Sequence, residues 1–175
     1  EALRFPESAA GVLGEVAAIA AALGRLGRPH RVAAVHGLDD VASLLAGSPE
    51  RIVFNLVEDF AADADDASLV PAFVRAHGKE CVGGDWPCLA LTTDKWQTRA
   101  ILEAAGLPVA RGVLVPVGGR YEPRRLPAGR VIVKPVASDA SEGIDEDAVG
   151  PRDGPGVRRA IRRVHEQFAQ AALVE

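Results

Sequence analysis

The sequence has 175 residues, 48% of them hydrophobic and 25% charged, which is typical of a globular protein with one substantial core or two small domains. The formal net charge of −4 argues against a nucleic-acid surface, and the purest apolar run, residues 16–23, is too short to cross a membrane. Cys81 and Cys88 form neither a disulfide framework nor a metal-binding pattern, so we expect a reducing, cytoplasmic compartment.

The first half of the chain alternates expected helices and strands. Apolar residues recur at helical spacing over residues 13–26 and predict a helix with one apolar stripe. Residues 31–35 and 51–57 are predicted strands, and a further helix lies between them. The order helix, strand, helix, strand predicts a parallel sheet with crossover helices, although no strand is readable before the first helix.

An acidic stretch, residues 58–66, follows the second of these strands. Ligands of open α/β sheets bind at this edge, so the stretch could meet a metal ion or a cationic substrate. A solvated loop before the next predicted helix, residues 68–77, explains the same residues without any ligand. A short strand around Cys81 completes this half. Cys81 itself is expected to act as a small buried hydrophobe.

A lysine opens the next predicted helix. Asp94 is placed to cap that helix, with Gln97 three residues later as its capping-box partner. Lys95 then lies in the first turn, where the helix dipole is unfavourable for a cation unless an anion is nearby. We expect the apolar residues of this helix to form a buried stripe: Trp96, Ala100, Ile101, Ala104 and Ala105.

The most informative stretch is residues 130–144. Three β-branched residues predict a buried strand that ends at Pro135, and residues 138–143 are small, polar and suited to a loop. A lysine at the end of a buried strand, here Lys134, can hold a polyphosphate together with backbone N–H groups of such a loop. A snorkelling lysine beside a surface loop explains the same pattern without a ligand.

The chain ends in a helix and the start of a strand. The helix is predicted from Pro155 to Phe168, with four arginines outside its apolar stripe that could meet phosphate or simply face solvent. Residues 171–175 read as a strand, so we expect the chain to continue beyond Glu175. The sequence contains neither GxxxxGK nor GxGxxG, which argues against a P-loop and against a plain dinucleotide-binding domain.

Taken in order, these segments resemble the D-alanine–D-alanine ligase branch of the ATP-grasp superfamily. The resemblance covers residues 52–175. It is carried by six segments that occur here in the same order as in the family. They are FNLVE (54–58), VPAFVRAHGKECVGG (70–84), LALTTDKWQTRAILEAAGLPVARGVLV (89–115), VIVKP (131–135), SDASEGI (138–144) and the terminal LVE (173–175).

The resemblance implies a nucleotide site. Lys95 matches the lysine that reaches the nucleotide phosphates, and Lys134 matches the strand lysine that contacts phosphate and adenine. Ser141 and Gly143 match the mobile loop over the β- and γ-phosphates, and Glu175 matches the start of the segment that meets the adenine amino edge. No catalytic residue and no metal ligand is assigned in this chain.

The resemblance also implies a fold and a function. The fold expected is α/β: a Rossmann-like, pre-ATP-grasp parallel-sheet domain (residues 1–91), then the first α+β ATP-grasp subdomain (residues 92–175), with the C-terminal ATP-grasp half absent. The function expected is that of an ATP-dependent carboxylate–amine ligase, which uses ATP and Mg²⁺ and forms an amide bond through an acyl phosphate. The alternative is a non-catalytic nucleotide-binding or partner-binding module.

The substrate expected is a small amino acid or a peptide, without nucleic acid or membrane as partner, and a homodimer is left open. D-alanine ligases carry a histidine-glycine segment and a GEDG-like stretch where this chain has Asn55 and residues 58–66. Their amine-binding glutamate has no match near Ala10. We therefore expect D-alanine to be a poor substrate. We also expect the 175 residues alone to be inactive, because the family's Mg²⁺ ligands lie in the C-terminal half.

Overall fold

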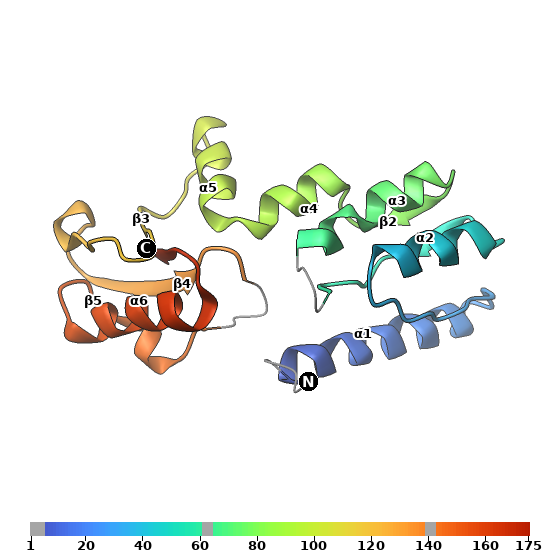
Figure 1. The fold of residues 1–175 in the computed structure, drawn as a ribbon, viewed down its shortest axis with the longest axis horizontal. Helices are drawn as coiled ribbons and strands as arrows, with labels where there is room; N and C mark the ends of the chain where they lie inside the picture. The colour runs from blue at the N-terminus through green and yellow to red at the C-terminus, as the bar shows by residue number, and fades with distance from the viewer. Residues whose placement is uncertain (1–5, 61–64, 139–142) are drawn as a thin grey trace. The chain divides into compact units, whose positions relative to one another are not determined.

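The computed structural model describes residues 6–60, 65–138 and 143–175. The chain divides into two compact units, Glu1–Ala90 and Leu91–Glu175, and each combines helices with a small sheet (Figure 1). Within the described ranges, no helix is both long enough and apolar enough to cross a membrane.

The first unit contains a parallel pair of strands. Its elements in chain order are α1 (Pro6–Arg25), α2 (Leu38–Gly47), β1 (Ile52–Phe54), a 3₁₀ turn (Asp65–Leu69), α3 (Val70–Ala76), β2 (Glu80–Val82) and the start of α4 (Trp86–Thr93). Strands β1 and β2 pair in parallel, with Val53 opposite Cys81. The expectation of parallel strands with a helical crossover is confirmed for this pair.

The core of the first unit lies between α2, α3 and the residues after β1. Its buried members are Val41, Leu45, Phe60, Ala67, Val70 and Val74. Cys81 on β2 packs against this cluster and is half-buried, and desolvation there raises the pKa of its thiol. Cys81 thus acts largely as the small hydrophobe that the sequence indicates.

One expectation for the first unit is wrong, and one feature of its first helix could not be foreseen. Residues 31–35 form no strand, because β-structure needs a ladder partner and the two-stranded sheet of the described residues consists of β1 and β2 alone. Helix α1 forms where its periodicity predicts it, but its apolar stripe is not buried. Leu13 is 71% exposed and Leu26 is 72% exposed. Periodicity therefore predicted the helix correctly but not a partner for its apolar face.

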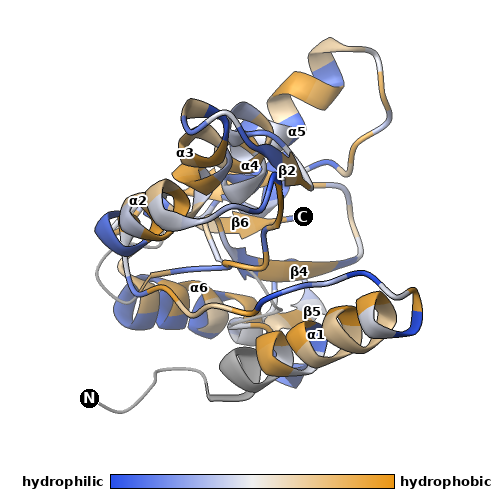
Figure 2. Cartoon of the chain, turned by 90° about the vertical axis from the view of Figure 1, so that its right-hand side faces the viewer, coloured by the Kyte–Doolittle hydropathy of each residue, from blue (hydrophilic) through white to orange (hydrophobic). Residues whose placement is uncertain are grey.

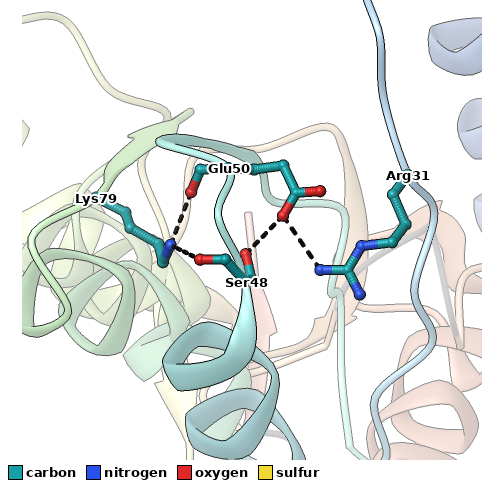
Figure 3. A network of polar contacts seen from close by, with 4 residues as sticks. All are labelled: Arg31, Ser48, Glu50 and Lys79. Carbon is teal, nitrogen blue, oxygen red and sulfur yellow. Dashed lines mark hydrogen bonds and ion pairs between the residues drawn. The ribbon is translucent and has the colours of Figure 1, made fainter.

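A polar network closes the turn between α2 and β1 (Figure 3). The Lys79 ammonium, just before β2, donates 2.7 Å hydrogen bonds to the carbonyls of Ser48 and Glu50. The Glu50 carboxylate accepts from the Ser48 hydroxyl at 2.8 Å and from the Arg31 guanidinium at 3.2 Å. These contacts lower the pKa of Glu50 to about 2. The largest cause is the hydrogen bond from Ser48, followed by a backbone hydrogen bond and then by Arg31.

The second unit is built on an antiparallel sheet. Its elements are the end of α4, α5 (Lys95–Ala104), β3 (Val113–Val115), a 3₁₀ turn (Pro123–Arg125), β4 (Arg130–Pro135), a 3₁₀ turn (Glu146–Ala148), β5 (Val149–Pro151), α6 (Pro155–Phe168) and β6 (Ala172–Val174). The strands lie in the order β3-β6-β4-β5. All three neighbouring pairs are antiparallel.

Helix α6 covers one face of this sheet (Figure 1). Figure 2 shows hydrophilic (blue) and hydrophobic (orange) residues alternating along α6. The buried cluster joins one side of α6 to the strands and comprises Val113, Val115, Tyr121, Leu126, Val131, Val133, Val157, Ala160, Ile161, Val164, Ala172 and Val174. Tyr121 belongs to this core, and its hydroxyl donates to the Arg152 carbonyl at 3.1 Å.

Helix α5 does not bury its apolar residues. The five residues expected to form a buried stripe include none that is buried, and Ile101 is 52% exposed. Trp96 is partly covered by the Arg99 guanidinium, which lies 5.0 Å from its ring centroid, and Arg99 also donates to the Ala110 carbonyl at 2.8 Å. Capping and local contacts thus define α5, while the expectation of a packed stripe is wrong.

Candidate functional site

The strand β4 presents different residues to the two faces of the sheet. Val131, Val133 and Pro135 are buried on the side of α6, whereas Ile132 and Lys134 alternate with them and face the other side. In β6, Val174 lies opposite Val133, so Leu173 and Glu175 share the second face with Lys134. The second face therefore carries both a lysine and a glutamate of the predicted site.

Strand β4 ends at Pro135, as expected, and the ladder explains why a proline is tolerated there. The Ile132 and Glu175 backbones exchange two hydrogen bonds, of 2.7 and 3.1 Å. Pro135, three residues further on, pairs with Ala172 in a position that does not exchange hydrogen bonds with β6. Its nitrogen faces the side on which β5 pairs only with residues 130–132. No ladder bond is lost at Pro135.

Lys134 and Glu175 form a direct ion pair. The Lys134 Nζ lies 2.6 Å from Glu175 Oε1, and the two side chains are 26% and 17% exposed. This short, charge-assisted hydrogen bond holds the ammonium at a fixed place above the strands. The pair offers a ligand one cationic donor and one anionic acceptor side by side.

Lys95 is tied to the continuation of β4. The Asp94 side chain caps α5 by accepting from the backbone of Trp96 at 2.8 Å and of Gln97 at 2.9 Å. The predicted cap is confirmed, although the Gln97 amide donates to the Asp94 carboxylate at 2.9 Å, whereas in a capping box this side chain would accept from the Asp94 N–H. The Lys95 backbone donates to the Val136 carbonyl, and its ammonium donates to the Ser138 carbonyl.

Gly143 packs directly on the end of β4. It has φ of 72°, a conformation that favours glycine, and an added Cβ would lie 2.8 Å from the Phe168 ring and 3.0 Å from Pro135. Close packing alone thus explains a glycine at this position, whether or not a phosphate binds. The predicted Ser141 lies outside the described residues.

The described residues of the predicted site each have contacts in or next to β4. Lys134 is the penultimate residue of β4 and pairs with Glu175, Lys95 bonds to the chain just after β4, and Gly143 contacts Pro135. These four residues come from separate parts of the sequence and each lies near β4, but Lys134 and Glu175 lie on the face opposite α6, whereas Gly143 packs on the α6 side against Pro135 and Phe168. One ammonium and one carboxylate, those of Lys134 and Glu175, are in direct contact, while the Lys95 ammonium binds the backbone of Ser138.

One residue of this region was missed by the sequence reasoning. Gln170 hydrogen-bonds the backbone of Ala137 through both its oxygen and its nitrogen, at 2.8 Å each. Its only sequence signal is its place, a polar residue between the apolar stripe of α6 and the apolar run of β6. Such a signal does not distinguish a structural amide from a solvent-facing one.

An open hollow of about 410 Å³ lies in the first unit and is acidic. It is lined by His36, Gly37, Leu38, Asp39, Asp40 and Asp66. The Asp40 carboxylate accepts from the His36 backbone at 2.9 Å, and both Asp39 and Asp40 occupy the first turn of α2, where the dipole favours acidic residues. These contacts give Asp39 and Asp40 a structural role, while part of the acidic stretch 58–66 lies outside the described residues.

Residues suited to a metal ion are not grouped in the described parts of the chain. Among residues 6–60, 65–138 and 143–175, no three His, Cys, Asp or Glu side chains come together in a way that could hold a metal ion. The described residues therefore do not fit a resident Mg²⁺.

Comparison with known proteins adds to this geometry. No family model matches the sequence. A D-alanine–D-alanine ligase of Gluconobacter oxydans is 33% identical over 77% of this chain and 41% of its own length, and one of a Caulobacter strain has the same identity and coverage. The chain thus spans about two fifths of the length of the curated relatives that it matches.

A solved structure supports the same relationship at the level of fold. The D-alanine–D-alanine ligase of Helicobacter pylori superposes with a TM-score of 0.54 and 19% identity, over 71% of this chain and 38% of that one. Together with the matching sequences, this likeness places the chain among the D-alanine–D-alanine ligase-like proteins of the ATP-grasp superfamily.

Proposed function

We propose that this chain supplies nucleotide-binding residues to an ATP-dependent carboxylate–amine ligase. The observation that carries the proposal is the pairing of Lys134 with Glu175 on the sheet face opposite α6. The relatives named as D-alanine–D-alanine ligases support the reaction class. Such a ligase activates a carboxylate with ATP and then joins it to an amine, with an acyl phosphate between the two steps.

Each residue of the site has a proposed role. The ammonium groups of Lys134 and Lys95 offset the negative charge of the phosphates, and the Glu175 carboxylate accepts a hydrogen bond from the amino group of the base. Gly143, the last residue of the proposed phosphate loop, keeps the chain close to Pro135 and Phe168. Mg²⁺ would neutralise further phosphate charge, and the resemblance places its ligands in the C-terminal half of such ligases.

The proposed substrate is an amino acid or a small peptide other than D-alanine. A substrate ammonium that leaves water needs a carboxylate partner, and the glutamate expected for D-alanine has no match here. The assay is phosphate release from ATP and Mg²⁺ by the whole protein, first with D-alanine and then with a panel of amino acids and dipeptides. We expect release with a member of the panel that exceeds release with D-alanine.

Variants make this assay specific. Lys134→Ala should abolish most of the release, whereas Arg120→Ala removes an exposed positive charge of the same unit and should leave it intact. The highest turnover with D-alanine would overturn the substrate assignment. Nucleotide binding without release for any acid and amine pair would instead identify a non-catalytic module, and no nucleotide binding would overturn the proposal itself.

A further inference from the structure

The Gln170 side chain pairs with a peptide backbone as a neighbouring strand would. Its Oε1 accepts from the Ala137 N–H at 2.8 Å, and its Nε2 donates to the Ala137 carbonyl at 2.8 Å. The same Nε2 lies 3.3 Å from the Ser138 hydroxyl oxygen. Both backbone groups of one residue are thus satisfied by one amide.

The position of Gln170 explains why a side chain performs this task. The last backbone bond between the two strands runs from the Val136 N–H to the Ala171 carbonyl, at 3.1 Å. Just before Gln170, the chain turns at Ala169, which ends α6 in the left-handed region at φ of 54°. The amide of Gln170 therefore extends the pairing by one residue beyond the point where the backbones separate.

The same short segment is bound by Lys95. The Lys95 N–H donates to the Val136 carbonyl at 3.0 Å, and its ammonium donates to the Ser138 carbonyl. Residues 136–138 are therefore held by Lys95 and also by Gln170. The Ser138 carbonyl, which accepts the ammonium, lies one peptide beyond the Ala137 carbonyl that Gln170 binds.

We propose that Gln170 is a positioning residue for Lys95. By fixing Ala137 through two hydrogen bonds, it orients the Ser138 carbonyl and with it the ammonium that would meet the nucleotide phosphates. The expected effect on nucleotide binding rests on the proposed function. The coupling of Gln170 to Lys95 does not, because it concerns contacts among the described residues. Gln170 itself is not expected to touch the nucleotide.

The test uses a matched pair of variants in the whole protein. Gln170→Met keeps the length of the side chain and removes both hydrogen bonds, whereas Gln167→Met makes the same change at an exposed position of α6. The first readout is the NMR signal of the Lys95 side chain without nucleotide, recorded well below the melting temperature of each variant. We expect Gln170→Met to shift this signal and Gln167→Met to leave it in place.

The second readout is a double-mutant cycle on the affinity for a non-hydrolysable ATP analogue, measured by calorimetry. Gln170→Met should weaken binding about fivefold when Lys95 is present and have no effect beyond about twofold in a Lys95→Met background. A residue that only stabilises the fold would weaken binding equally in both backgrounds. That equal loss, or an unshifted Lys95 signal, would overturn the inference.

The two proposals fail in different ways. If the whole protein binds no ATP analogue, the proposed function is wrong, and the Lys95 signal alone decides whether Gln170 positions it. If the wild-type protein binds the analogue and the cycle shows no coupling, the function survives and Gln170 has a structural role only.

Discussion

The Lys134 ammonium and the Glu175 carboxylate lie 2.6 Å apart on neighbouring antiparallel strands, although 41 positions separate them in the sequence. The first prediction concerns the lysine. Lys134→Ala should weaken the binding of an ATP analogue by ~1.5–3 kcal/mol, the range for a hydrogen bond to a charged group. Calorimetry with the whole protein measures this, with Arg120→Ala as control. Unchanged affinity in a folded variant would contradict the proposed role.

The second prediction concerns the glutamate of the same pair. Glu175→Gln removes the negative charge and leaves Lys134 partly buried without its ionic partner, so the free energy of unfolding should fall by ~1–2 kcal/mol. Urea unfolding measures the change. Glu166→Gln alters an exposed glutamate of α6 and should change stability by less than ~0.5 kcal/mol. Equal stability of the two variants would show that the pair contributes nothing measurable.

The third prediction separates backbone strain from close packing at Gly143. Gly118 has φ of 73° with no atom within 4 Å of an added Cβ, so Gly118→Ala should cost ~1 kcal/mol from the backbone alone. Gly143 has φ of 72° and an added Cβ would lie 2.8 Å from the Phe168 ring, so Gly143→Ala should cost ~2–4 kcal/mol. Thermal or urea unfolding gives both values, and similar losses would rule out the packing explanation.

The fourth prediction follows from Glu50, whose pKa falls from 4.5 to about 2 in the folded chain. Because the folded pKa is the lower one, the stabilisation is fully present above pH 4.5 and is lost as the pH falls toward 2. Wild type and Glu50→Gln should therefore approach each other in stability over this range.

The carboxyl signal of Glu50, followed by NMR during an acid titration, reports its pKa directly. Ser48→Ala should raise this pKa more than Arg31→Ala does, since the serine hydrogen bond is the largest cause and the arginine is a smaller one. A larger effect of Arg31→Ala would mean that charge, rather than the hydroxyl, controls this carboxylate.

Local signals in the sequence predicted local structure well. The cap at Asp94, the end of β4 at Pro135 and the start of α6 at Pro155 each follow from the chemistry of one or two residues, and each is found in the structure. The apolar stripe of α6 was also correct, because a sheet lies against it and buries Val157 and Val164.

Interactions between distant segments were less predictable. Residues 31–35 have the composition of a strand but no ladder partner, and α1 and α5 have apolar stripes without a buried residue among the described ones. Composition gives the preference of a segment, whereas pairing and burial depend on what else is nearby. The amide of Gln170 was missed for the same reason, since its target lies 33 positions away.

The proline that ends β4 also limits how the sheet can grow. Among the described residues, no strand pairs with this side of β4 past Ile132, and an unpaired strand edge is a template for pairing with another chain. Pro135 has no backbone N–H, so a carbonyl group of a strand added alongside would find no donor at this position. The residue that closes the strand thereby also protects this edge against unwanted association with other chains.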